Sequence, residues 1–147
     1  GPVAILVMDA GEDKPDANAE YSGMADFDSY RLKELEWLRQ AVTDPVFSEA
    51  PVKVAVMHIP AFREEGSWYG QTWVNENFVP VLNQAGVDLM LSGHIHNHVY
   101  VPAGQNGNTF PILCSSNKER FIVTSDGETI EVKAYDTSGN LTESYTF

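Results

Sequence analysis

The sequence lacks the residues that several common classes of site require. It has one cysteine, Cys114, so neither an internal disulfide nor a pair of cysteine metal ligands can form. Lys and Arg number 9 against 21 Asp and Glu, a formal net charge of -12. Nucleic acids and anionic membranes are bound by basic surfaces, so this balance argues against both. Phosphate chemistry stays open where a metal supplies the positive charge, and no apolar run is long enough to span a membrane.

The apolar pattern predicts an α/β fold of βαβαβ order, followed by an antiparallel β meander. Nearly continuous apolar runs are typical of parallel strands that helices cover. After residue 98, short alternating segments are separated by turn signals such as Asp126-Gly127, which predicts the meander. We expect a single domain over residues 1–147. The predicted elements are strands at 3–8, 52–57 and 87–91, a helix from Asp26 or Asp28 to about Val42, and a helix from Gln71 to about Ala85 that contains Pro80.

Histidine is scarce, and all four histidines follow predicted strands. Three lie in LSGHIHNH at residues 91–98, and His58 follows VAVM at 54–57. Ligand sites of open α/β sheets lie beyond the carboxyl ends of the strands, so we expect these two loops and Asp9, which follows the first strand, to converge. In an extended segment His94 and His96 would point the same way, and Gly93 permits an unusual backbone turn beside them.

Neutral imidazole is the commonest protein ligand for metals near pH 7, so the pattern indicates a metal site. The plainer interpretations stay open for each residue. His58 alone is compatible with an ordinary hydrogen-bonded histidine, Asp9 with a loop cap, and His98 with a polar corner that enters the next strand.

Several segments together resemble the calcineurin-like metallophosphoesterases, the family that includes the purple acid phosphatases. They are VAVMHIP (54–60), LMLSGHIH (89–96), ILVMDAG (5–11) and LKELEWLRQAV (32–42). The resemblance implies that the chain forms part of a four-layer α/β/β/α sandwich. It also implies that His58 and His94 bind one metal ion and His96 a second, in a pair drawn from Mn, Fe or Zn that hydrolyses a phosphate ester substrate. His98, Asp9, Trp68 and Tyr69 would then border the substrate.

The N-terminal motifs of that family are not in this sequence. They are Asp-x-His, Gly-Asp-x-x-Asp and Gly-Asn-His-Asp/Glu, and they supply the carboxylates that a two-metal site needs for hard cations. The first strand also begins within a few residues of the start of the chain. We therefore expect a C-terminal portion of a metallophosphoesterase domain that is inactive, or nearly so, by itself. Neighbours missing from the sheet would leave an exposed edge, so we expect self-association there.

A binding or structural module is the alternative in a different class. The aromatic residues of segment 67–73, Trp68, Tyr69 and Trp73, are of the type that dominates protein and carbohydrate contacts. The interpretation that we favour is that they cover a groove beside the metal site or pack on the second predicted helix. Neither the Gly-x-Ser-x-Gly motif of serine hydrolases nor a phosphate-binding Gly-x-x-x-x-Gly-Lys loop occurs.

Overall fold

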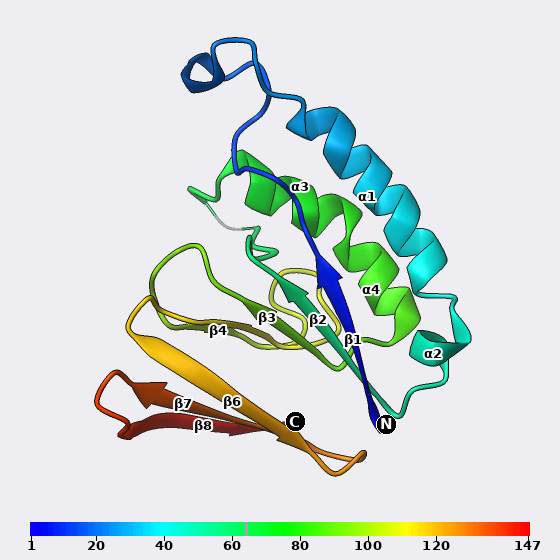
Figure 1. Cartoon of the computed structure of the whole chain (residues 1–147), viewed down its shortest axis with the longest axis vertical. Helices are drawn as coiled ribbons and strands as arrows, with labels where there is room; N and C mark the ends of the chain where they lie inside the picture. The colour runs from blue at the N-terminus through cyan, green and yellow to red at the C-terminus, as the bar shows by residue number, and fades with distance from the viewer. Residues whose placement is uncertain (64) are drawn as a thin grey trace.

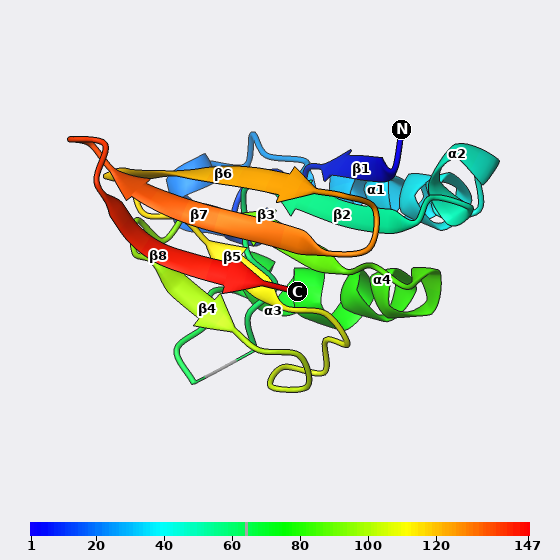
Figure 2. The ribbon, with the colours of Figure 1, turned by 90° about the horizontal axis from the view of Figure 1, so that it is seen from below.

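The structure is a computed structural model that describes residues 1–63 and 65–147. Two sheets pack face to face, and the helices lie on the other face of the larger sheet (Figures 1 and 2). The larger sheet has the order β1-β2-β3-β5-β4, with β1 (Val3–Met8), β2 (Val52–Met57), β3 (Leu89–Ser92), β4 (Val99–Val101) and β5 (Ile112–Cys114). The smaller sheet is the antiparallel series β6 (Glu119–Ser125), β7 (Ile130–Asp136) and β8 (Leu141–Thr146).

The helices are α1 (Phe27–Ala41), α2 (Pro45–Ser48), α3 (Tyr69–Asn77), α4 (Val79–Ala85) and a short 3-10 helix, η1 (Ala19–Tyr21). Asp26 is the N-cap residue of α1, but the carboxylate that caps the helix belongs to Asp16, which accepts hydrogen bonds from the backbone N–H of Phe27 (2.7 Å) and Asp28 (3.1 Å). No helix in the described ranges is long and apolar enough to cross a bilayer.

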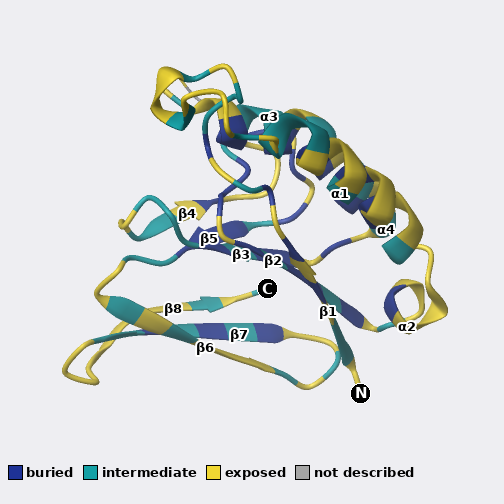
Figure 3. Ribbon diagram, turned by 45° about the horizontal axis from the view of Figure 1, so that its top comes forward, coloured by how far each residue is buried: buried dark blue, intermediate teal, exposed yellow. Residues whose placement is uncertain are grey.

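Burial on both faces explains why the central strands are apolar throughout. Figure 3 shows that buried residues concentrate in the middle of the larger sheet. In β2, Ala55 and Met57 pack toward the helices with Leu38 of α1, while Val54 packs toward β7 with Val132. Each large apolar side chain fully buried in this way contributes about 1.5 to 3 kcal/mol of transfer free energy. The predicted α/β class, with a parallel sheet and an antiparallel one, is confirmed.

Two local predictions were wrong. The strands of VYVP and TFPILC do not join the meander: β5 pairs parallel with β3, and β4 pairs antiparallel with β5. All three residues of β5 are buried, as befits an interior strand. The predicted helix of residues 71–85 is divided at Phe78 into α3 and α4. Pro80, at the second position of α4, has no N–H to continue the ladder of α3.

Strand β1 forms an edge of the larger sheet. Within the described residues it pairs only with β2, so the backbone groups of its outer edge have no strand partner. Ile5 and Val7 are 59% and 71% exposed, whereas Leu6 and Met8 are buried under the helices. The exposed edge that we expected is therefore present, and self-association through it stays a prediction.

We expect the chain to self-associate in solution, and we expect Val7→Lys to shift it toward monomer, because a lysine on an edge strand opposes pairing with another strand. Sedimentation velocity over a concentration series would measure the shift. Met24→Lys is the matched control, since Met24 is 86% exposed in the loop between η1 and α1, outside both sheets. A wild-type chain that stays monomeric at every concentration would contradict the prediction.

Candidate metal centre

The parallel pairing of β2 with β3 brings the two histidine loops together. His58 follows β2, and Gly93 follows β3. The backbone N–H of Gly93 donates to the carbonyl of His58 (3.1 Å), and the Cys114 thiol at the end of β5 donates to the carbonyl of Gly93 (2.6 Å). Three neighbouring strands thus fix the base of the Gly-His-x-His loop.

His94 is the centre of the cluster. Its Nδ1 lies 3.3 Å from Nε2 of His58, and its Nε2 lies 3.0 Å from Oδ2 of Asp13. The rings of His58 and Trp68 each meet the His94 ring edge to face, with centroids 5.1 Å and 5.7 Å away. Both ring nitrogens of this imidazole therefore have a specific neighbour, and two other rings pack against it.

A recess of about 540 Å³ opens beside these rings. His94 is partly buried there, whereas His58 and His96 are exposed. The structure thus brings all three predicted metal ligands to one cavity. Its lining consists of His58, Trp68, Gln71, His94, Ile95 and His96.

The backbone of the Gly-His-x-His loop differs from the expected extended form. His94 and His96 both have positive φ, 69° and 57°, while Gly93 does not. The N–H of Ile95 bonds to the carbonyl of Gly93 (2.8 Å), which makes the loop a tight turn. Left-handed backbone at a residue other than glycine costs on the order of 1–3 kcal/mol and is concentrated at functional sites. The unusual conformation thus falls on the two histidines, and not on the glycine that was expected to carry it.

The facing nitrogens of His58 and His94 fit joint ligation of one ion. Two nitrogens that each lie about 2.0 to 2.1 Å from a tetrahedral ion are about 3.3 to 3.4 Å apart. The observed separation is 3.3 Å. Asp13 lies on the opposite side of the His94 ring, so it cannot share that ion. In the described part of the chain, no three His, Cys, Asp or Glu side chains form a group that could hold a metal. His58 and His94 alone could therefore supply only part of the ligand set of a metal ion.

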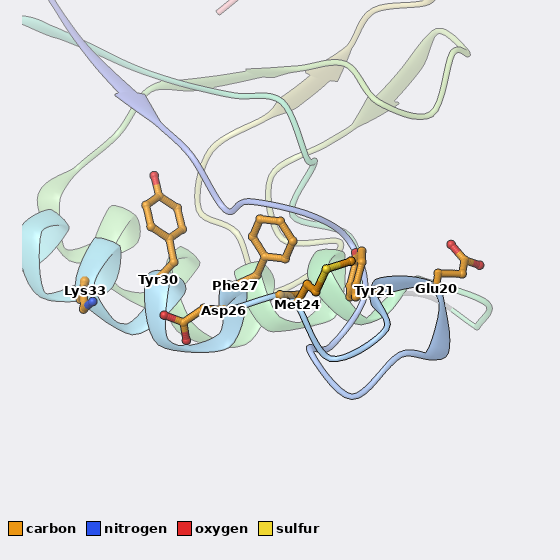
Figure 4. A pocket seen from close by; sticks show the side chains of 8 residues that line it. Glu20, Tyr21, Met24, Asp26, Phe27, Tyr30 and Lys33 are labelled. Atoms are coloured by element: carbon orange, nitrogen blue, oxygen red, sulfur yellow. The ribbon is translucent and has the colours of Figure 1, made fainter.

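Asp9 lies outside the recess. Its carboxylate accepts from the Tyr30 hydroxyl (3.2 Å) and from the N–H of Gly11 (2.9 Å), so it is directed at α1. Tyr30 borders a separate hollow of about 580 Å³ around the start of α1 (Figure 4). Because no histidine lines that hollow, we assign the candidate centre to the histidine recess.

His98 connects the two sheets. Its Nδ1 lies 2.9 Å from Oε1 of Glu119 on β6, and its Nε2 lies 2.8 Å from the Tyr145 hydroxyl on β8. The Glu119 side chain is only 8% exposed. His98 is thus outside the lining of the recess, and its two ring nitrogens are engaged in contacts between the sheets.

The two aromatic candidates differ in position. Trp68 is 54% exposed, lines the recess and touches His94. The Tyr69 hydroxyl instead donates to Asp28 (3.2 Å), and its ring lies against the guanidinium of Arg31 (5.4 Å). Only Trp68 is placed to meet a ligand in the recess.

Sequence reasoning missed Asp13 and Gln71. Asp13 is 2% exposed and contacts His94, and Gln71 is 4% exposed and lines the recess. Asp13 lies in a polar loop with several other carboxylates, and no spacing in the sequence distinguishes it from them. Gln71 lies in the first turn of α3 and accepts a hydrogen bond from the N–H of Trp68 (2.9 Å), so its sequence position indicates the start of a helix and not a site.

The Cys114 thiol is predicted to be inert in the folded chain. Burial raises its pKa to about 12, so the nucleophilic thiolate is absent at neutral pH. We expect no reaction with a disulfide reagent such as DTNB in the native state, and full reaction in denaturant. Rapid native labelling would contradict the packing of β5 described above.

Two solved structures have a fold similar to that of this chain. The fold is similar to that of GAP50, the anchor in the inner membrane complex of Plasmodium, with a TM-score of 0.67, 14% identity, and coverage of 97% of this chain and 48% of that one. It is similar to the same degree, 0.67 and 14%, to purple acid phosphatase PPD1 from yellow lupin (Lupinus luteus) seeds, with coverage of 99% of this chain and 31% of that one. The chain thus spans about half of the first structure and a third of the second.

A comparison with curated proteins gives no match. The family model described as calcineurin-like phosphoesterase matches residues 4–98. That region is well over half of the chain, and it includes the recess histidines and both strands that hold them. The chain belongs to the calcineurin-like phosphoesterase family.

Proposed function

We propose that this chain is part of a metal-dependent phosphoesterase in which His58 and His94 bind one metal ion and His96 binds a second. The observation that carries the proposal is the 3.3 Å separation of Nε2 of His58 and Nδ1 of His94, which suits two ligands of one ion. His96 lines the same recess, and its exposed ring is free to approach a neighbouring ion.

The ions that we propose are Mn, Fe or Zn, because imidazole suits Fe and Zn, and Mn would be held with the help of carboxylates that complete the centre. When bound, they supply positive charge to the oxygens of a phosphate ester and activate water. Hard cations also need carboxylate ligands, and the family's Asp-x-His and Gly-Asp-x-x-Asp motifs are not in this sequence. We propose that residues outside these 147 supply them. The protein's own charge of -12 makes the metal the source of attraction for an anionic substrate.

Trp68 is the residue of this chain that we propose to contact substrate. It forms a wall of the recess, and its ring packs against His94. The indole body would cover the organic part of a phosphate ester and exclude water from the metal side. Asp9, His98 and Tyr69 have their polar atoms engaged elsewhere, so we propose no substrate contact for them.

Calorimetric titration with Mn(II) tests the half-site directly. We expect binding by the wild-type chain, and a loss of at least tenfold in affinity for His94→Ala or His58→Ala, since each removes one of two facing nitrogens. His98→Gln is the matched control, because His98 is in the same loop but outside the recess. Equal binding by wild type and His94→Ala would refute the assignment.

Hydrolysis is the second test. We expect the isolated 147 residues to show little or no metal-dependent hydrolysis of an aryl phosphate. Three imidazoles, those of His58, His94 and His96, do not complete a two-metal centre without carboxylate ligands. Robust activity that requires added metal and disappears in His94→Ala would contradict this expectation, and it would show that the chain is sufficient by itself.

A non-catalytic module is the second candidate. A structural neighbour is described as an anchor, and Trp68 and Tyr69 are 54% and 41% exposed. Under this proposal segment 67–73 binds a protein or a carbohydrate. Such binding would be unaffected by a chelator and lost in Trp68→Ala, whereas phosphate ester recognition through metal would be abolished by the chelator.

A further inference from the structure

We propose that Asp13 is a positioning residue that orients His94 and holds its proton on Nε2, so that Nδ1 presents its lone pair toward His58. The orienting role stands on contacts within this chain. Its consequence for metal affinity rests on the proposed function.

The hydrogen-bonding chemistry of the two side chains fixes the direction of the bond. An ionised carboxylate only accepts, so the short contact between Oδ2 of Asp13 and Nε2 of His94 (3.0 Å) places the ring proton on Nε2. In the neutral ring Nδ1 is then an acceptor, and it is this atom that lies 3.3 Å from Nε2 of His58. The hydrogen bond between Asp13 and Nε2 thus leaves Nδ1 as the His94 nitrogen that is able to bind a metal ion.

Burial strengthens the contact. The Asp13 side of the contact is shielded from water, since Asp13 is 2% exposed, and a charge-assisted hydrogen bond is stronger than a neutral one. The other carboxylate oxygen, Oδ1, lies 3.3 Å from Nζ of Lys14. Each oxygen of the Asp13 carboxylate therefore has its own partner: Oδ1 contacts Lys14, and Oδ2 contacts His94.

The loop that carries Asp13 is fixed by a buried cation. The Arg31 side chain is fully buried in α1 and donates to the carbonyls of Glu12 and Lys14, one on each side of Asp13. Asp28 pairs with the same guanidinium (2.8 Å). Because this buried guanidinium donates to the carbonyls on both sides of Asp13, it restricts the position of Asp13.

The first turn of helix α3 also contacts this loop. The N–H of Gly70 donates to the carbonyl of Asp13 (2.8 Å). A Cβ at position 70 would lie 2.8 Å from Cα of Asp13, closer than real Cβ contacts, so only glycine allows this approach. The first turn of α3 also carries Gln71 of the recess, so α3 places the recess wall and the Asp13 loop together.

A purely structural role for Asp13, as a buried partner of Lys14, is the competing explanation. The two roles differ in what they predict for His94. Only the positioning role requires that the His94 ring proton be on Nε2 and that it respond to the charge of residue 13.

Nitrogen-15 NMR of the histidine rings in the metal-free chain is the test. We expect wild-type His94 to be protonated at Nε2, with an N–H proton protected from solvent exchange. Asp13→Asn replaces the charge-assisted bond with a neutral one of about half the strength, or presents an N–H in its place. Either amide orientation must shift the His94 signals and speed the exchange.

Glu12→Gln is the matched control, since it removes the same charge from the adjacent, exposed residue. We expect no change at His94, and circular dichroism would verify that both variants fold. A wild-type His94 protonated at Nδ1, or His94 signals identical in wild type and Asp13→Asn, would overturn the proposal.

Titration with Mn(II) separates this proposal from the function it serves. Loss of a partner that orients a ligating histidine typically lowers metal affinity about 10- to 100-fold, and we expect that loss for Asp13→Asn but not for Glu12→Gln. If the wild type binds no Mn(II), the proposed function fails, while the NMR result still decides the role of Asp13. If the wild type binds and Asp13→Asn binds equally, the positioning role is refuted.

Discussion

The parallel alignment of β2 with β3 is the constraint on which the candidate centre depends. Val56 lies beside Leu91, so the two strands end at the same level, and the next residues place His58 against Gly93. The register is fixed because the side chains on both faces of these strands are buried, one set under the helices and the other under the smaller sheet. A slip of one residue would exchange those faces and separate the two loops.

Short segments of the sequence are sufficient to predict these strands and the loops that follow them. Continuous apolar runs identify β1, β2 and β3 as parallel strands, and the rule that ligands bind beyond strand ends then places His58 near His94. The Gly-His-x-His pattern adds a chemical reason for the placement. These signals were sufficient for the fold class and for placing three histidines at one recess, because each signal is a run of neighbouring residues; the binding of metal by these histidines stays a prediction.

Other features depend on contacts that no short segment records. Asp13 and Asp9 are both acidic residues after the first strand, yet one is buried against His94 and the other is directed at Tyr30. The difference comes from Arg31, which fixes the loop around Asp13 from a distant helix. Strand β5 is similar, since its three apolar residues fit a meander as well as a central strand until β3 is in place. The turn at His94 and His96 arises likewise from the closure of the loop.

The pairing pattern also bears on the order in which the molecule assembles. The smaller sheet is built from hairpins, in which Ser125 pairs with Ile130, whereas β2 joins β3 through the pairing of Val54 with Leu89. Closing a long loop costs more chain entropy than closing a hairpin, so non-local pairings form late in folding. The recess depends on those late pairings, and a partly folded chain would present the hairpins without any nitrogen pair to capture an ion.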